Sequence, residues 1–307
     1  MNMSIAHLGL GLLGAILLTN GALAKPDKTP SLKDAYKGHF YVGAAINGSI
    51  AADKPSGYGN RSAEQVNKDI ALVKQQFNQI SPENDLKWQS IHPREGADGY
   101  NFGPADAYVA FGIKNHMLIV GHTLVWHAQT PNWVFAGKTP PAGAAGAPAA
   151  PATPPAPAEG AHRGFGGRFG GFTGPKATRA ELLERMRDHI HTVVGRYKGK
   201  VKCWDVVNEA IADGGGTNIL RNSIWLEIIG PDFIAKAFEN AHEADPDAIL
   251  RYNDYGLENP VKRKKLATLI KWLQAQKVPI HAIGSQAHIY VAMTFETMDH
   301  SLAELTA

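Results

Sequence analysis

The pair Asn208-Glu209 is the first feature of this sequence that could do chemistry. It ends residues 201–207, an apolar, β-branched run with the composition of a strand buried on both faces. In a parallel α/β barrel, the C-terminal ends of the strands open onto the active-site face. Partial desolvation there favours the protonated form of a carboxyl group, which is the form that a general acid needs. The pair also fits a plain capping role at a helix start.

Several other predicted strands end in side chains that form hydrogen bonds or stack on rings. These residues are Glu83, Asn84, Lys87 and Trp88, then His122, Trp126, His127 and Gln129, then Asn253, Asp254 and Tyr255, and finally Gln286 and His288. Such a mixture suits a neutral, polyhydroxylated ligand, because hydroxyl groups need donors and acceptors and a pyranose stacks on aromatic rings. Each cluster alone could be polar residues at the start of a loop. Their recurrence at the same end of successive strands favours a sugar-binding face.

Strands and helices alternate along the chain, and this alternation positions the polar residues. The predicted strands are 40–46, 79–81, 117–126, 201–207, 248–254 and 281–287, and the predicted helices are 62–78, 104–114, 178–197, 231–244, 260–276 and, as the weakest segment, 298–305. Strands separated by helices of this length predict a parallel sheet with right-handed crossovers. We therefore expect six βα units of an α/β fold.

Length and composition fit one large barrel or two small domains. The 307 residues are 44% hydrophobic and 19% charged, as in an ordinary globular protein. The net charge of +3 is too small and too scattered to indicate nucleic acid as a partner. The run Lys262-Arg263-Lys264-Lys265 is predicted to be the solvated face of a helix start. Cys203 is the only cysteine, which excludes an intrachain disulfide, and it is predicted to be a small core residue.

The first 24 residues have the pattern of a secretory signal peptide. Leu8 to Leu18 is an apolar run, too short to span a membrane, and Ala22-Leu23-Ala24 provides the small residues of a cleavage site. We expect residues 25–307 to be secreted, either outside the cell or into the periplasm. No membrane attachment is expected after the signal is removed.

An insertion rich in Pro, Ala and Gly, at about 139–177, interrupts the third βα unit. Its first half has the composition of an extended, polyproline-like chain. Its second half, 163–172, alternates aromatic residues with Arg and Gly, a mixture that can stack on sugars or on single-stranded RNA. An unstructured insertion in a βα loop is the interpretation that we favour.

Four motifs together resemble glycoside hydrolase family 10, the secreted endo-β-1,4-xylanases. They are, in chain order, Gly121 to His127 (GHTLVWH), Trp204 to Ala210 (WDVVNEA), Asn253-Asp254-Tyr255, and Gly284 to His288 (GSQAH). The resemblance runs from about residue 31 onward, apart from the insertion. It implies a TIM-type (β/α)8 barrel, with only about six of the eight βα units in this sequence.

The resemblance also implies a role for each polar strand end. Glu209 corresponds to the general acid/base, and Asn208 to the residue that holds the sugar 2-hydroxyl. The implied substrate-binding residues are Glu83, Asn84, Lys87, His122, Trp126, His127, Gln129, Asn208, Tyr255 on the leaving-group side, Gln286, and His288, which resembles the histidine beside the nucleophile. The family retains anomeric configuration by using two carboxyl groups, one as acid/base and one as nucleophile.

The implied partners are xylan and xylo-oligosaccharides, with no cofactor and no obligate protein partner. The histidines offer an alternative, since imidazoles are common metal ligands. His122 and His127 are five residues apart on an extended segment, and His288 lies on another strand. These spacings do not match a HExxH motif or a related ligand set, so no metal is predicted.

One part of the family pattern is absent from this sequence. The family's nucleophile is a Glu at the end of the seventh strand, in a segment resembling Ile-Thr-Glu-Leu-Asp, and no such segment occurs here. Glu258, Glu296, Asp299 and Glu304 lack a strand-end position, so we assign no nucleophile to this chain. We therefore expect an incomplete barrel with exposed sheet edges and doubtful activity by itself.

Three functions remain open at this point. The first is endo-β-1,4-xylanase activity, internal cleavage of xylan with retention of configuration, in the complete enzyme. The second is non-catalytic binding of xylan or xylo-oligosaccharides. The third is hydrolysis of another β-1,4-glycan, that is, a β-1,4-glucanase.

Overall fold

The structure, a computed structural model, describes residues 29–54, 56–137, 172 and 174–306. Its centre is a single sheet of six strands: β1 (Gly43–Ile46), β2 (Gln79–Pro82), β3 (Leu118–Trp126), β4 (Cys203–Asn208), β5 (Ile249–Asp254) and β6 (Ala282–Ser285). The strands lie in chain order, and each is parallel to the next. The predicted parallel α/β sheet is therefore confirmed.

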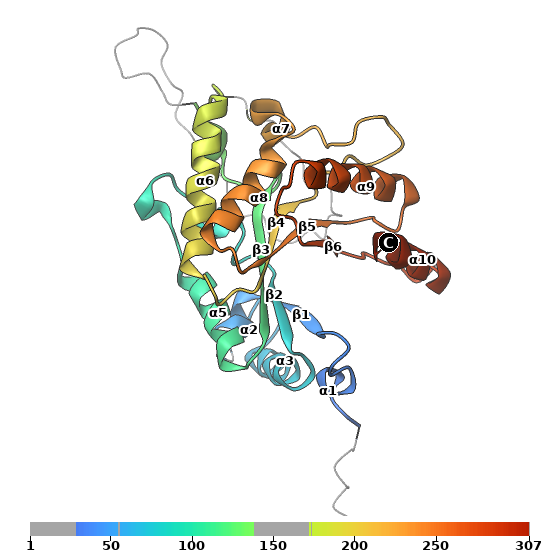
Figure 1. Ribbon diagram of the computed structural model, residues 1–307. Coiled ribbons are helices and arrows are strands. Elements are labelled where there is room, and N and C mark those ends of the chain that lie inside the picture. The colour runs from blue at the N-terminus through green and yellow to red at the C-terminus, as the bar shows by residue number, and fades with distance from the viewer. Residues whose placement is uncertain (1–28, 55, 138–171, 173, 307) are drawn as a thin grey trace, which may run out of the picture.

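Long helices follow the strands and cover the outside of the curved sheet. They are α3 (Ala63–Gln76), α5 (Gly103–Lys114), α6 (Arg179–Arg196), α8 (Phe233–Ala244), α9 (Pro260–Ala275) and α10 (Phe295–Thr306). In Figure 1 they follow one another from α3 below, through α5, α6 and α8 on the left, to α9 and α10 on the right. Within the described residues β1 and β6 each pair on one side only, so the sheet has two open edges. This is the arrangement expected for about six units of a (β/α)8 barrel.

Local sequence explains where several of these helices begin. Ser62 and Gln65 form a capping box at the start of α3, and Thr178 and Glu181 form another at the start of α6. In each box the side chain of the first residue accepts a hydrogen bond from a backbone N–H of the first turn. The Gln or Glu side chain accepts one from the backbone N–H of the first residue. The helix α9 begins with Pro260, whose missing N–H costs nothing at that position.

Element boundaries differ from the predicted ones mainly at the edges of the sheet. The first strand begins at Gly43 rather than at residue 40, and Phe40 and Tyr41 are exposed. The sixth strand ends at Ser285, so Gln286 and His288 lie just beyond it. Short helical segments were not predicted, because three to six residues are too few to show a helical period. They are α1 (Leu32–Ala35), α2 (Gly48–Ala51), α4 (Trp88–Ile91), α7 (Ile224–Ile229) and the 3₁₀ turns Ala97–Gly99 and Asn132–Phe135.

Fully buried aromatic side chains fill the space between sheet and helices. Trp204 on β4 and Tyr252 on β5 are completely buried. Tyr108 on α5 is buried as well, and its hydroxyl reaches the carbonyl oxygens of Ile80 and Val120 at 2.9 and 2.7 Å. These contacts tie α5 to both β2 and β3. Cys203 is a buried free thiol, as predicted, and burial raises its pKa to about 11.

The prediction of a solvated Lys262-to-Lys265 run is wrong for three of its four residues. Lys262, Arg263 and Lys265 are buried, and only Lys264 is exposed. Carbonyl groups of neighbouring loops supply the acceptors that their charges need: Arg263 donates to the oxygens of Leu257 and Glu258, and Lys265 to those of Ala212 and Gly214. The first two turns of α9 therefore hold these loops together.

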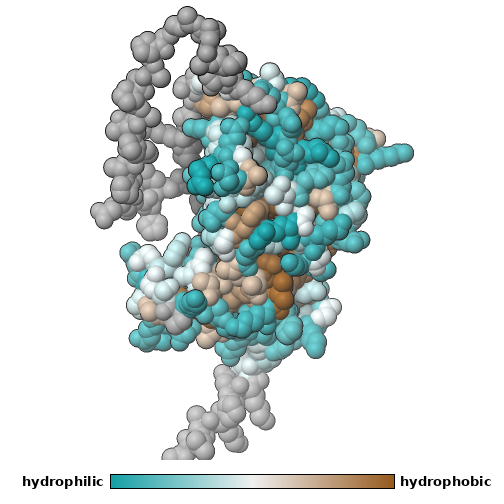
Figure 2. Space-filling view, turned by 90° about the vertical axis from the view of Figure 1, so that its left-hand side faces the viewer, coloured by the Kyte–Doolittle hydropathy of each residue, from teal (hydrophilic) through white to brown (hydrophobic). Residues whose placement is uncertain are grey.

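Two of the predicted segments lie outside the described residues. They are the signal peptide at 1–24 and most of the insertion at 139–177, so both stay predictions. Among the residues that are described, none of the helices is long and apolar enough to cross a membrane. On the face shown in Figure 2, hydrophilic residues dominate, and hydrophobic residues gather in patches at its centre and in its lower half.

The contact between β3 and β4 yields a test of the core. A Cβ atom at Gly121 would lie 2.1 Å from the ring of Trp204, which is fully buried and cannot move aside. We expect Gly121→Ala to lower the free energy of unfolding by about 2 kcal/mol, measured by chemical denaturation.

The control for this substitution is Gly195→Ala on the exposed surface of α6. No atom lies within 4 Å of a Cβ built at Gly195. Alanine should stabilise the helix there by about 0.5 kcal/mol. Equal effects of the two substitutions would contradict the packing described here.

Candidate active site

Glu209 lies directly after β4 and is 7% exposed. Its φ of 57° is in the left-handed region, which is uncommon for a residue other than glycine and recurs at functional sites. Its backbone N–H donates to the carbonyl oxygen of Asn253 on β5 at 2.9 Å. Each carboxyl oxygen accepts a hydrogen bond: Oε2 from the Trp126 indole and Oε1 from the Gln286 amide, both at 3.0 Å. Donors from the ends of β3 and β6 thus fix the carboxyl group of Glu209.

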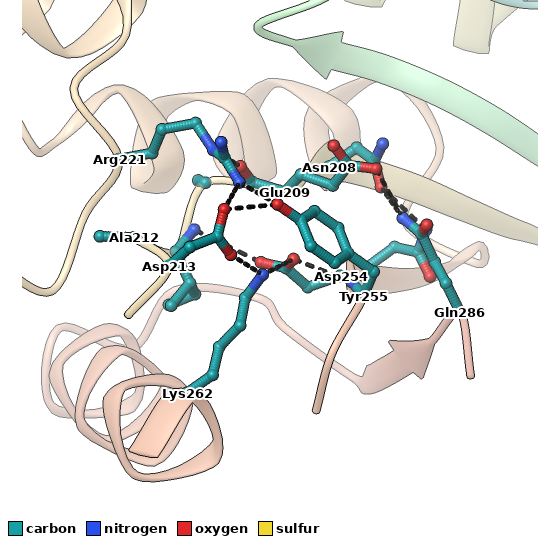
Figure 3. A network of polar contacts seen from close by, with 12 residues as sticks. Asn208, Glu209, Ala212, Asp213, Arg221, Asp254, Tyr255, Lys262 and Gln286 are labelled. Atoms are coloured by element: carbon teal, nitrogen blue, oxygen red, sulfur yellow. Dashed lines mark hydrogen bonds and ion pairs between the residues drawn. The ribbon is translucent and has the colours of Figure 1, made fainter. Parts of the chain in front are cut away.

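A row of amides continues from Glu209 across the sheet. Asn208 Oδ1 accepts from the Asn253 amide at 2.8 Å and from Gln286 at 3.1 Å, and both asparagines are buried. Gln286 in turn lies 2.9 Å from Nε2 of His288. The order Asn253, Asn208, Gln286, His288 therefore links β5, β4 and the segment after β6 beside the carboxyl group. Figure 3 shows Asn208 and Gln286 of this row.

His122 is oriented by a buried ion pair one layer deeper. Its Nδ1 lies 3.0 Å from Asp205 Oδ2, and the other carboxyl oxygen of Asp205 accepts from Arg251 at 2.6 Å. Burial opposes ionisation of Asp205, yet the hydrogen bond from His122 and the charge of Arg251 lower its pKa. An ionised Asp205 accepts from Nδ1–H, so the tautomer of His122 is set and its Nε2 is left for a ligand.

The residues predicted after β2 form a polar group beside Trp126. Lys87 donates to Asn84 at 3.0 Å and to Gln129 at 2.8 Å, and its ammonium lies 5.1 Å from the Trp126 ring. Burial lowers the pKa of Lys87, and the negative charges of Glu209 and Glu83 oppose this shift. The structure thus brings Asn84, Gln129 and Glu83 close to Lys87, and their role as sugar contacts stays a prediction.

His127 is held as a neutral imidazole. Desolvation lowers its pKa to about 3, and the positive charges of Arg221 and Lys262 add to this effect. Its ring lies edge-on to Trp126, with centroids 5.9 Å apart. A neutral imidazole offers one donor and one acceptor, which suits hydroxyl groups.

Tyr255 belongs to a charged network that the sequence did not indicate (Figure 3). Its hydroxyl donates to Asp213 and accepts from Arg221 at 2.7 Å. The guanidinium of Arg221 also donates from Nε to the carbonyl oxygen of Glu209 at 3.0 Å. Arg221 thereby joins the backbone of Glu209 to the tyrosine on the neighbouring strand end.

Lys262, near the start of α9, also belongs to this network. Its ammonium pairs with Asp213 at 2.8 Å and with Asp254 at 2.9 Å, and it lies 3.5 Å from the centre of the Tyr255 ring. Burial raises the pKa of Asp254, whose side chain is fully buried, against the lowering effect of Lys262. Ion pairing with Lys262 and the Tyr255 hydroxyl outweigh desolvation at Asp213 and lower its pKa to about 2.

All the predicted site residues thus lie around the ends of β2 to β6, in three connected groups. The first surrounds Glu209, the second Lys87, and the third Tyr255. Sequence reasoning missed Asp213 and Arg221, because they lie in the irregular loop 209–223 and belong to no motif. It also missed the role of Lys262, whose position in a run of basic residues indicated a solvated surface.

Of the carboxylates considered as nucleophiles, Glu258 lines a pocket together with Asp213, Tyr255 and Lys262 of the third group. Glu258 is buried in the loop after β5, and Glu304 on α10 pairs with Arg263. Among the residues that the structure describes, no cluster of three or more His, Cys, Asp or Glu side chains could hold a metal ion.

The buried pair of Lys262 and Asp254 can be tested against its neighbour in the same basic run. Lys262→Met leaves the Asp254 carboxyl group in a fully buried position without its cation. We expect the free energy of unfolding to fall by about 3 kcal/mol at pH 7. Lys264→Met, on the exposed side of α9, should change it by less than about 0.5 kcal/mol. Similar losses in the two variants would show that the ion pair does not act as described.

The low pKa of His127 gives stability that depends on pH. The folded protein keeps this imidazole neutral down to about pH 3, whereas the unfolded chain binds its proton near pH 6.5. The contribution of His127 to the free energy of unfolding is therefore complete above pH 6.5 and is lost as the pH falls toward 3. Between pH 7 and 4.5, wild type should lose about 1–2 kcal/mol more stability than His127→Gln, after allowance for partial exposure.

The pH dependence of stability must be compared between wild type and variants, because the pKa values of other histidines are lowered as well. Burial also lowers the pKa values of His92 and His189. A matched control is His39→Gln, at an exposed position, which should lose as much stability on acidification as wild type. If His127→Gln follows the wild-type curve too, the imidazole is not desolvated as described.

Comparison with known proteins agrees with this geometry. The profile of glycosyl hydrolase family 10 matches residues 31–153 and 165–307. A β-1,4-xylanase from Dictyoglomus thermophilum is 42% identical over 265 residues, which cover 86% of this chain and 59% of the relative. An endo-1,4-β-xylanase from Geobacillus stearothermophilus is 39% identical over 259 residues, which cover 84% of this chain and 62% of the relative.

Solved structures give the same result. An intracellular xylanase from Thermoanaerobacterium saccharolyticum, a variant in complex with xylotetraose, superimposes with a TM-score of 0.71 at 34% identity, covering 91% of this chain and 73% of the other. The chain thus spans less than two thirds of the length of the two curated relatives. The chain belongs to glycosyl hydrolase family 10.

Proposed function

We propose that this chain carries the acid/base and most of the sugar-binding face of an endo-β-1,4-xylanase. The observation that supports this most directly is the position of Glu209 between two N–H donors, from Trp126 and Gln286, at the end of β4. In the proposed reaction, Glu209 gives a proton to the leaving glycosidic oxygen of an internal β-1,4-xylosidic bond. It then takes a proton from the water that completes hydrolysis.

The proposed substrate follows from the groups that surround Glu209. Amides from Asn208 and Gln286, the neutral imidazole of His127 and the indole of Trp126 match hydroxyl groups and pyranose faces. Relatives named as xylanases, and a structural neighbour solved with xylotetraose, favour xylan among neutral β-1,4-glycans. A β-1,4-glucan remains the alternative, and it differs by a hydroxymethyl group on each ring.

Retention of configuration needs a second carboxylate as nucleophile, and we assign none in this sequence. Without it, the covalent glycosyl-enzyme cannot form, and most of the catalysis is lost. We therefore propose that the chain as given binds xylan, and that a carboxylate supplied from outside can replace the nucleophile. Formate is a suitable substitute. Its oxygen would bond to the anomeric carbon as the glycosidic C–O bond breaks and the leaving oxygen takes the proton of Glu209, and water would then hydrolyse the glycosyl formate to the free sugar and formate.

The test is hydrolysis of xylan by purified chain, with and without sodium formate. We expect release of reducing sugar only with formate, and a loss of roughly 100-fold or more of this release in Glu209→Gln. The control is Glu227→Gln on α7, where an exposed glutamate forms an ion pair with Lys176. It should keep the wild-type rate.

Other outcomes separate the remaining functions. Binding of xylohexaose by calorimetry, with no turnover even in formate, would favour the non-catalytic binding protein. Faster formate-dependent release from β-glucan than from xylan would favour the glucanase. Turnover without formate that Glu209→Gln abolishes would show that a carboxylate of this chain does serve as nucleophile.

A further inference from the structure

A second groove lies outside the cluster around Glu209. It has a volume of about 650 Å³ and runs between the loop 217–222, which precedes α7, and the solvent side of α9. The same loop passes beside α9 at the upper right of Figure 1. None of the residues that line the groove is charged, although charged residues make up 19% of the protein. The groove is therefore suited to a neutral ligand.

The polar groups of the groove are those that recognise hydroxyl groups. Thr217, Asn218 and Asn222 line it from the loop, and Thr268 lines it from α9. The hydroxyl of Thr217 and the amides of the two asparagines can each donate and accept a hydrogen bond. The Thr268 hydroxyl donates to the carbonyl oxygen of Lys264 at 3.0 Å, so toward a ligand it acts as an acceptor. A purely apolar partner would leave these groups without a function in the contact.

Trp272 provides an aromatic platform on the same wall. It lies on α9, one helical turn after Thr268, and is 39% exposed, whereas Trp88, Trp204 and Trp225 are almost completely buried. An indole exposed beside hydroxyl and amide groups can stack on the apolar face of a pyranose while its neighbours bind the ring hydroxyls. The groove thus shares an indole beside amide groups with the strand ends around Glu209, but it carries no charge, and half of its lining residues are aliphatic: Ile219, Leu220, Leu226, Pro231 and Leu269.

The loop wall of this groove is also joined to the end of β4. Ile211 and Leu220 form an antiparallel bridge, and the backbone N–H of Ala212 donates to the oxygen of Ile219 at 2.9 Å. The backbone N–H of Arg221 donates to the oxygen of Ala210 at 2.7 Å, and its side chain donates to the oxygen of Glu209. The groove is therefore separated from the acid/base by a single ordered loop.

We propose that this groove is a second, non-catalytic binding site for a xylan chain, with Trp272 as its stacking residue. The inference rests on the proposed function for its choice of ligand. A polymer held in this groove keeps the enzyme on its substrate while another part of the same or a neighbouring chain enters the site at Glu209. Binding to insoluble xylan then exceeds what the site at Glu209 provides alone.

The first measurement follows the indole N–H signals by NMR during titration with xylohexaose. Trp272→Ala and Trp126→Phe assign the two signals of interest. We expect both signals to shift, with two different affinities. A shift at Trp126 alone would overturn the second site and leave the proposed function intact. A shift at Trp272 alone would support the groove but contradict the proposed site at Glu209, and no shift at either would contradict both.

The second measurement is depletion of protein from solution by insoluble xylan. Trp272→Ala should weaken binding about fivefold, and Trp272→Tyr should restore most of it, because a phenol ring also stacks. Tyr58→Ala removes a comparably exposed aromatic side chain elsewhere and should bind like wild type. Equal binding by Trp272→Ala and wild type would overturn the proposal, as would a groove that takes up an apolar dye but no xylohexaose.

Discussion

Burying a polar group costs free energy unless it finds a hydrogen-bond partner, and the position of Glu209 depends on this requirement. Glu209 is held at its backbone N–H, at its carbonyl and at both carboxyl oxygens, by Asn253, Arg221, Trp126 and Gln286 in turn. Since each partner comes from a different segment, the carboxyl group keeps its place only while the sheet keeps its register. The position of the Glu209 carboxyl group therefore depends on the packing of the barrel.

Below the strand ends, close packing sets how near the strands come to each other. Gly121 and Trp204 are in register on neighbouring strands, and the glycine leaves the space that the indole fills. A layer higher, the ion pair of Asp205 and Arg251 lies next to this contact and orients His122. A buried ion pair is no guarantee of stability, because desolvation offsets its attraction. Here the ion pair fixes the orientation of the His122 imidazole near the C-terminal end of β3.

The loop 209–223 connects two surfaces that have different chemistry. Its inner side carries Asp213 and Arg221, which with Lys262 form a charged frame around Tyr255. Its outer side carries threonine and asparagine beside Trp272, without any charge. Charged side chains fix the conformation around Tyr255 and the backbone of Glu209, and uncharged ones line the groove, where we propose that a neutral polymer binds. One loop would then serve both the chemistry and the retention of substrate.

Sequence by itself determined the alternation of strands and helices, and it indicated the strand ends, with Glu209 and its motif neighbours, as the candidate site. Hydrophobic periodicity and short motifs are local, so they can be read without a structure. The tertiary structure alone decided that Lys262, Arg263 and Lys265 are buried, and that Asp213 and Arg221 belong to the site. Burial of a charge depends on acceptors that other segments supply, in this case carbonyl groups and carboxylates from loops up to about fifty residues away in sequence. No local pattern of residues carries that information.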